Sequence, residues 1–238
     1  LNEISPDHHP SFTIQISSTI PVAAGMGSGA AISVAIIRAL SAFLGKPLTA
    51  RKISALAFEV EKIHHGTPSG IDNAVITYEK PVYFIRNNPI RFLNIKKQTH
   101  WVIADTGERT PTRDSVFAVS ELFKEYPQYY GSVFNSIRKV SHQGRKALIN
   151  GDLSTIGTLM NENQQLLEML DVSNNRLNHL IETARNAGAM GAKLSGGGRG
   201  GNIIALASPD KIDPIEKALI HAGASRVITT LLSKGNTR

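Results

Sequence analysis

A carboxylate on a short turn stands in this sequence between two glycine-rich loops. Asp72 ends the stretch His65-Gly66-Thr67-Pro68-Ser69-Gly70-Ile71-Asp72, with one such loop upstream and the other downstream. Glycines between a strand and a helix let successive backbone N–H groups approach an anion, and the helix N-terminus adds its partial positive charge. A carboxylate on a rigid turn can orient a hydroxyl and accept its proton during phosphoryl transfer. Together the three stretches predict chemistry at a phosphate.

The first loop, Pro21 to Ala31, follows a strand-like run and opens a helix-like run. The residues expected to form its phosphate cradle are Gly25, Met26, Gly27, Ser28, Gly29 and Ala30. Ser28 adds a hydroxyl suited to Mg2+ or phosphate. The loop has neither the terminal Gly-Lys-Ser/Thr of a Walker loop nor the Gly-x-Gly-x-x-Gly of a dinucleotide fingerprint. The pattern therefore predicts a nucleotide-binding fold of another kind.

The last loop has five glycines within residues 196–201 and lies between two strand-like runs. Its candidate ligand-binding residues are Ser195, Gly196, Gly197 and Gly198. So many glycines indicate that the backbone of this loop comes very close to a neighbouring group. The spacing leaves open whether this loop touches a phosphate or buttresses the first loop.

The polar residues near the central turn each have a second interpretation. Asp72 could be an ordinary turn or capping aspartate. Glu61, at the edge of an apolar helical stripe, could hold a Mg2+ that bridges phosphate oxygens or could pair with Lys62 or Arg51. His65 is more often a hydrogen-bonded polar residue than a ligand, and a chain without cysteine offers it no zinc site.

Composition narrows the class of protein. The 238 residues carry 26 Lys plus Arg against 19 Asp plus Glu, a formal charge of +7 that favours polyanions. No zinc-finger spacing, aromatic RNA-binding signature or basic zipper accompanies that charge, so we expect no nucleic-acid partner. The longest apolar stretch, Ala30 to Leu44, is interrupted by Arg38 and too short to span a membrane. The lack of cysteine excludes disulfides and is compatible with a reducing cytoplasm.

Periodicity and turn residues predict the elements that must carry these loops. Strand patterns cover residues 12–17, 73–78, 81–86, 101–105, 192–195, 202–207 and 226–232. Helical patterns cover residues 28–44, 49–64, most of 112–186, and 214–222, with breaks at Pro127, Gly131, Gly151 and Ser173. Turn formers replace apolar periodicity between Asn87 and Lys97, so we expect domains over residues 1–92 and 93–238. Helices on one side of a mainly antiparallel sheet make the fold class α+β.

The three stretches resemble those of the GHMP small-molecule kinases, which include galactokinases, homoserine kinases, mevalonate kinases and phosphomevalonate kinases. Pro21 to Ala31 looks like the second motif of the family, and Lys193 to Gly201 looks like its third. Within the family, His65 to Asn73 and the stretch from Asp105 to Val116 are most similar to the mevalonate kinases. The resemblance covers nearly the whole chain. It implies a two-domain fold whose C-terminal helices pack on an antiparallel, ferredoxin-like sheet.

The resemblance also implies an activity, the ATP- and Mg2+-dependent phosphorylation of the primary hydroxyl of mevalonate in cytoplasmic isoprenoid synthesis. By position, Asp72 matches the catalytic aspartate of the family and Glu61, with Ser28, its Mg2+ site. Gly25 to Ala30 match the triphosphate loop, while His65 and Thr112 fall where the family lines its substrate pocket. Another GHMP kinase acting on phosphomevalonate, a sugar or homoserine is the alternative, as is an inactive nucleotide-binding protein. Whether the protein is a homodimer stays open.

The sequence departs from the family pattern in several places. No counterpart of the first family motif precedes Leu1, so the chain looks truncated and we expect the 238 residues alone to be inactive. Gly29 stands where the family usually has a second serine, and Asn202 replaces a frequent cysteine. Arg199 adds a cation to the last loop.

Overall fold

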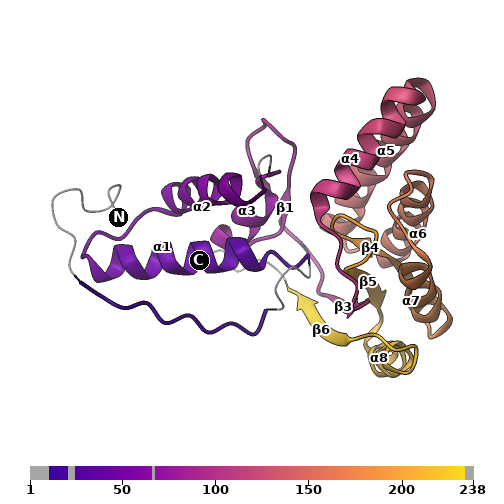
Figure 1. Ribbon diagram of the computed structural model, residues 1–238. Coiled ribbons are helices and arrows are strands. Elements are labelled where there is room, and N and C mark those ends of the chain that lie inside the picture. The colour runs from indigo at the N-terminus through magenta and orange to yellow at the C-terminus, as the bar shows by residue number, and fades with distance from the viewer. Residues whose placement is uncertain (1–10, 21–24, 66–67, 234–238) are drawn as a thin grey trace. The chain divides into compact units, whose positions relative to one another are not determined.

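The computed structural model in Figure 1 describes residues 11–20, 25–65 and 68–233. The chain divides into two compact units, Leu1–Phe92 and Leu93–Arg238, which are described separately below. Within the described residues, no helix is both long enough and apolar enough to cross a membrane.

The first unit is built mainly from three helices. They are α1 (Ser28–Phe43), α2 (Ala50–His65) and α3 (Ile71–Tyr78), followed by the short strands β1 (Val82–Tyr83) and β2 (Arg91–Phe92). The predicted helices over 28–44 and 49–64 are confirmed as α1 and α2. Val34 on α1 packs against Ile53 and Ala57 on α2, which forms a small buried cluster. The N–H of Lys52 donates to the Thr49 hydroxyl at 3.4 Å, so Thr49 marks the start of α2 as expected.

Residues 73–78, which we expected to form a strand, are helical. The run Val75-Ile76-Thr77 favours a strand by intrinsic preference. The helix nevertheless begins after Gly70, whose φ of 88° lies in the left-handed region, and it buries Ala74 and Thr77. The Arg38 guanidinium of α1 also donates to the Thr77 carbonyl at 2.7 Å. Packing on α1 and α2 therefore outweighs local propensity here.

Two other expected strands of this unit are also corrected. Residues 12–17 alternate as a strand should, but residues 11–20 take no strand assignment. A strand is stabilised by its ladder of hydrogen bonds, and no ladder involving residues 11–20 is found among the described residues. The strand expected over 81–86 is limited to β1, which pairs antiparallel with β2.

The second unit combines helices with a four-stranded sheet. Its elements are β3 (Thr99–Asp105), α4 (Thr112–Glu125), α5 (Pro127–Asn150), α6 (Leu153–Met169), α7 (Asn175–Asn186), β4 (Gly191–Ser195), β5 (Asn202–Ala207), the 3-10 turn Pro209–Lys211, α8 (Ile212–His221) and β6 (Arg226–Leu232). The strand order is β4-β5-β3-β6, and every pair is antiparallel. This order confirms the ferredoxin-like sheet and the α+β class.

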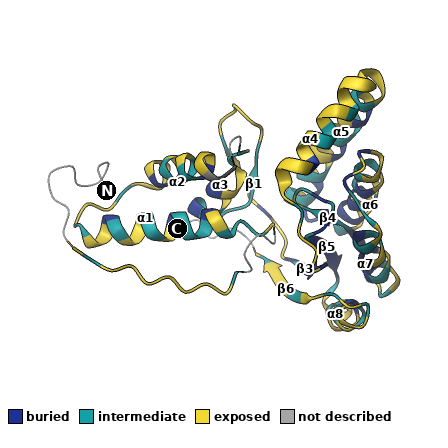
Figure 2. Cartoon of the chain, in the orientation of Figure 1, coloured by how far each residue is buried: buried dark blue, intermediate teal, exposed yellow. Residues whose placement is uncertain are grey.

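Alternation along the strands decides which face of the sheet is covered. Val102 and Ala104 on β3, with Ile203 and Ala205 on β5, enter the main core beside Leu180 of α7 and Leu219 of α8. Figure 2 shows the buried positions gathered on β4, β5 and the adjoining faces of α6 and α7. The opposite face carries a separate apolar cluster around Leu206. The sheet is thus anchored by α7 and α8 on one side.

Most of the expected helix breaks are confirmed, with one exception. Pro127 is the first residue of α5, and Gly151, with a φ of 68°, ends it. Gly131, which we expected to interrupt the helix, lies inside α5. A Cβ on Gly131 would meet nothing within 4 Å, so this glycine makes no special contact there. The other 23 residues of this 24-residue helix outweigh its low helix propensity.

The outer edge of β4 is closed by side chains. The N–H of Ala192 donates to Asn161 Oδ1 at 3.1 Å, and the N–H of Leu194 donates to Gln164 Oε1 at 2.9 Å, both on α6. The Arg185 guanidinium of α7 donates to the Ala192 carbonyl at 2.8 Å. These bonds satisfy backbone groups that an edge strand would otherwise leave unpaired.

Candidate functional site

The N-terminus of α1 is the candidate anion-binding feature of the first unit. Gly25 and Gly27 have φ values of 70° and 67°, which a residue with a Cβ rarely adopts. The first hydrogen bond within the helix runs from the Ala31 N–H to the Gly27 carbonyl at 2.9 Å. The amides of Ser28, Gly29 and Ala30 therefore precede the helical ladder, and no side-chain cap from the described residues covers this end. Such a helix end is suited to an anion.

Two carboxylates border this helix end. Asp72 lies in the first turn of α3, and a Cβ on Gly27 would stand 3.6 Å from the Cβ and Cγ of Asp72. Glu61 of α2 is buried, and a Cβ on Gly29 would stand 3.2 Å from its Oε1. The first turn of α1 thus lies beside both acids that the sequence singled out. Lys62, one of the alternative partners weighed for Glu61, pairs with Glu59 at 2.7 Å.

Some residues of the motif stretches lie outside the described residues. The segment Pro21 to Ala24, which begins the first loop, is one of them, and so are Gly66 and Thr67. His65 is the last residue of α2, and its side chain is also outside what the structure describes. The expected role of His65 in substrate binding therefore stays a prediction.

The donor set around α1 is compatible with a Mg2+ ion that is held mainly by phosphate. The described residues contain no group of three or more His, Asp and Glu side chains that could hold a metal by themselves. Mg2+ bound with a nucleotide needs only one or two protein carboxylates, because phosphate oxygens and water supply its other ligands. Glu61 and Asp72 offer carboxylate oxygens of that kind, so the residues present fit the ion.

The glycine loop 196–201 lies in the second unit and is described by itself. A Cβ on Gly198 would stand 2.0 Å from the Val172 carbonyl oxygen, so only glycine fits there. A Cβ on Gly197 would stand 3.0 Å from the hydroxyl of Thr112, the first residue of α4. Thr112 and the glycine loop therefore lie side by side, as expected if both belong to one site.

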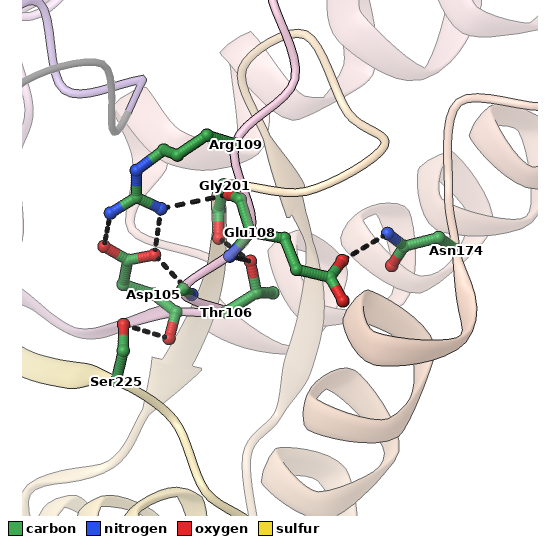
Figure 3. A network of polar contacts seen from close by, with 8 residues as sticks. Asp105, Thr106, Glu108, Arg109, Asn174, Gly201 and Ser225 are labelled. Atoms are coloured by element: carbon green, nitrogen blue, oxygen red, sulfur yellow. Dashed lines mark hydrogen bonds and ion pairs between the residues drawn. The ribbon is translucent and has the colours of Figure 1, made fainter.

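The segment 105–112 holds this glycine loop along one side, as Figure 3 shows in part. Thr106 donates twice to the Gly201 carbonyl, from its N–H and from its hydroxyl, at 2.8 Å each. The Gly201 N–H donates to the Glu108 carbonyl at 3.0 Å. The Thr110 hydroxyl donates to the Arg199 carbonyl at 2.7 Å. Both ends of the stretch 199–201 are thus fixed by hydrogen bonds to their main-chain atoms.

An ion pair stabilises the segment itself. Arg109 donates to both carboxylate oxygens of Asp105 at 2.7 Å, and Asp105 also accepts the N–H of Gly107 at 2.9 Å. Burial raises the pKa of Asp105, but the hydrogen bonds from Arg109 and Gly107 outweigh it, and the pKa lies below its ordinary value. The hydrogen bond to Asp105 raises the pKa of Arg109. Both groups are therefore charged at neutral pH.

Arg199, the extra cation of the loop, pairs with a neighbouring segment of the same unit. Its guanidinium donates to the carboxylate of Asp171 at 2.6 Å and to the Asp171 carbonyl at 3.0 Å. Its own N–H donates to the Val172 carbonyl at 2.7 Å. The charge of Arg199 therefore ties the glycine loop to the turn between α6 and α7.

Lys193 is a feature that sequence reasoning passed over. It lies on β4, two residues before Ser195, is partly buried and donates to the Leu194 carbonyl. Burial lowers the pKa of Lys193 to about 8. A lysine in an otherwise apolar strand was the available signal.

Comparison with known proteins places these motifs in a family context. Residues 1–80 match the family model described as GHMP kinases N terminal domain, and residues 145–225 match the one described as GHMP kinases C terminal. A mevalonate kinase of Thermococcus gammatolerans is 37% identical over 235 residues, which cover 94% of this chain and 67% of that relative.

Solved structures show the same similarity. A crystal structure of L. major mevalonate kinase in complex with R-mevalonate is 34% identical with a TM-score of 0.84, covering 88% of this chain and 66% of that one. Methanococcus jannaschii mevalonate kinase is 28% identical with a TM-score of 0.78, covering 91% and 67%. The chain thus spans about two thirds of the length of the relatives it matches.

Proposed function

The chain belongs to the GHMP kinases, and from that premise we propose that the protein phosphorylates the primary hydroxyl of mevalonate with ATP, a step of isoprenoid synthesis. One observation carries the proposal beyond family membership. The anion-binding end of α1 lies beside two carboxylates, with Asp72 next to Gly27 and Glu61 next to Gly29. A kinase needs such a combination, because it must hold a polyphosphate and handle a hydroxyl proton at neighbouring points.

In this proposal the amides of residues 25–30 bind the phosphates of ATP. Backbone N–H groups at a helix N-terminus suit this task, since they donate hydrogen bonds without a flexible side chain. The Asp72 carboxylate orients the mevalonate hydroxyl and accepts its proton as the phosphoryl group is transferred. Catalysis then rests on positioning and on electrostatic stabilisation.

We assign the Mg2+ ion to Glu61, with the Ser28 hydroxyl as a second contact. When bound, the ion would neutralise charge on the phosphate oxygens. The position of Glu61 supports the assignment, because its Oε1 would stand only 3.2 Å from a Cβ on Gly29, in the first turn of α1.

Thr112, His65 and residues 195–198 complete the proposed site. Thr112 and His65 would contact the mevalonate, and Ser195, Gly196, Gly197 and Gly198 would contribute to nucleotide binding. The contact between Thr112 and Gly197 supports a common role for the two segments of the second unit. We further propose that the protein acts in the cytoplasm. The protein is either a monomer or a homodimer, and a measurement of its native mass in solution distinguishes the two.

Replacing Asp72 by Asn in the native, full-length protein tests the catalytic assignment. The amide cannot accept the proton, so we expect kcat to fall at least about a hundredfold while the affinity for ATP changes little. Asp213→Asn is the matched control, because Asp213 is also an exposed aspartate in the first turn of a helix. Near-normal turnover in the Asp72 variant would show that this assignment is wrong.

The acceptor is tested by an ADP-release assay across mevalonate, phosphomevalonate, galactose and homoserine. We expect mevalonate to give the highest kcat/KM. A preference for another of these alcohols would keep the kinase chemistry and reject mevalonate. ATP binding without transfer to any of them would favour the catalytically inactive alternative.

A further inference from the structure

The glycine loop 196–201 is held by side chains that no catalytic role accounts for. We propose that Arg109 is a positioning residue, which acts through Asp105 and the Glu108 carbonyl to keep this loop in one conformation independently of ligand. The part of the inference that concerns catalysis rests on the proposed function. The part that concerns the loop conformation does not.

The first step is the rigidity of the turn at residues 105–109. Arg109 binds Asp105 through two hydrogen bonds of 2.7 Å, and the same guanidinium donates to the Glu108 carbonyl at 3.0 Å. The Asp105 side chain is 6% exposed and that of Arg109 is 35% exposed. A two-point pair of this kind fixes orientation as well as distance, and it is screened less than a pair at the open surface.

The second step is the transfer of this geometry to the glycine loop. The Glu108 carbonyl that Arg109 contacts is also the acceptor for the Gly201 N–H. Thr106, one residue after Asp105, supplies both donors to the Gly201 carbonyl. Figure 3 shows Arg109 joined to Asp105, and Thr106 joined to Gly201. If the turn loosens, all three bonds to Gly201 are affected together.

The third step is the closure of the network on the far side of the loop. The Glu108 side chain accepts a hydrogen bond of 2.7 Å from the amide of Asn174. The Oδ1 of Asn174 in turn caps α7 by accepting the Leu177 N–H at 2.8 Å. Arg199 joins the loop to Asp171 in the same turn. The loop is thus enclosed between two segments that are themselves bonded to each other.

The consequence for catalysis follows from where the loop lies. Gly197 stands against Thr112, which begins α4 only three residues after Arg109. The turn at 105–109 therefore sets both the glycine loop and the start of α4. A loop fixed in advance loses little entropy when it meets a ligand, and small displacements in such positions lower rates strongly.

Hydrogen exchange on the ligand-free native protein tests the inference directly. We expect Arg109→Ala to speed amide exchange in residues 196–201 about tenfold or more, because the bonds that restrain Gly201 weaken together. Arg109→Lys, which keeps one charged donor, should recover part of the protection. The control is Lys124→Ala, which removes an exposed ion pair of 2.7 Å with Glu121 in the same unit and should leave the loop unchanged.

A kinetic measurement separates positioning from a general loss of stability. Well below its melting temperature, where the variant is folded, Arg109→Ala should lower kcat about tenfold, and Arg109→Lys should lie between it and the wild type. Should Arg109→Ala fail to fold, Asp105→Asn, which keeps the shape but removes the charge, takes its place in both measurements.

Unchanged exchange in residues 196–201 for Arg109→Ala would overturn the inference. Faster exchange with a normal kcat would overturn the catalytic part of the inference, because the loop conformation would then not matter for turnover. If the wild-type protein transferred no phosphate to mevalonate, the proposed function would fail, and the exchange result would still decide whether Arg109 positions the loop.

Discussion

At the scale of single residues, the side chain at position 29 decides how closely α1 approaches the Glu61 carboxylate. Gly29 lies in the first turn of α1 with an ordinary φ, so a larger residue is restricted by its neighbour and not by backbone conformation. A Cβ there would stand 3.2 Å from Glu61 Oε1, closer than most such contacts. The departure of this chain from the family pattern at position 29 thus leaves Glu61 more room.

Replacing Gly29 by Ala separates this effect from helix stability. Alanine favours the helix, so we expect the free energy of unfolding to stay equal or rise. The Glu61 carboxylate must move by a few tenths of an ångström, and we expect kcat to fall about tenfold with a higher Mg2+ requirement. A Mg2+ titration of the initial rate measures this, with Gly131→Ala as the control for propensity. An unchanged Mg2+ requirement would argue against Glu61 as the ligand.

At the scale of elements, the contact between α6 and β4 depends on two glycines. A Cβ on Gly157 of α6 would stand 2.4 Å from the Met190 carbonyl oxygen, and one on Gly191 of β4 would stand 2.2 Å from the Gly157 carbonyl oxygen. Neither clash can be relieved by rotating a side chain, since both involve backbone atoms. The helix and strand can approach this closely only because both residues are glycine.

Replacing Gly157 by Ala should therefore force α6 away from the sheet. We expect the free energy of unfolding to fall by about 1–3 kcal/mol, the usual cost of overpacking, measured by urea denaturation. Gly144→Ala in α5 is the matched control, because a Cβ there meets nothing within 4 Å. It should stabilise by about 0.5–1 kcal/mol through helix propensity. Equal effects of the two variants would contradict the close-contact argument.

The sequence predicted the elements well wherever composition and period agreed. The bounds of β5 and β6 match the expected 202–207 and 226–232, because each is an apolar, β-rich run between turns. The helix α3 was missed. Its β-branched residues favour a strand, and the prediction gave them more weight than the glycine before the helix and the aspartate in its first turn. Contacts such as that between Glu108 and Asn174 join residues 66 positions apart, and no local sequence pattern predicts them.

The candidate site, too, could be predicted from the sequence only in part. The proximity of Gly27 to Asp72 was expected from the chemistry of the motifs, since each is useful only beside the other. The stretch beginning at Asp105 was noticed for its resemblance, but its structural task depends on the loop at Gly201, which follows it by 96 residues in the sequence. Positioning groups of this kind become visible only once the fold brings them together.

At the scale of the whole molecule, the formal net charge is +7, and Lys193 carries one of the positive charges into the sheet. Its pKa of about 8 in the folded protein lies below the ordinary lysine value of 10.5. Between these pH values the unfolded chain binds more protons than the folded one, so this residue makes stability rise with pH. Below pH 8 the full cost of the buried charge is present, at most about 3 kcal/mol.

We therefore expect Lys193→Met to gain stability relative to the wild type at pH 7 and to lose that advantage as the pH approaches 10. The comparison uses the change with pH, because the variant also lacks the hydrogen bond to Leu194. Urea denaturation at pH 7 and pH 9.5 measures it, with Lys124→Met as the control at an exposed site. A stability difference that stays constant with pH would contradict the lowered pKa.

The side chains that close β4 have a consequence for the behaviour of the protein in concentrated solution. An uncovered strand margin is a template on which another chain can add, and sheet growth of this kind leads to aggregation. Asn161, Gln164 and Arg185 occupy that template with groups from α6 and α7. As long as α6 and α7 stay packed against the sheet, this strand edge is protected from self-association. The two helices therefore help to keep the protein in solution as well as forming part of its core.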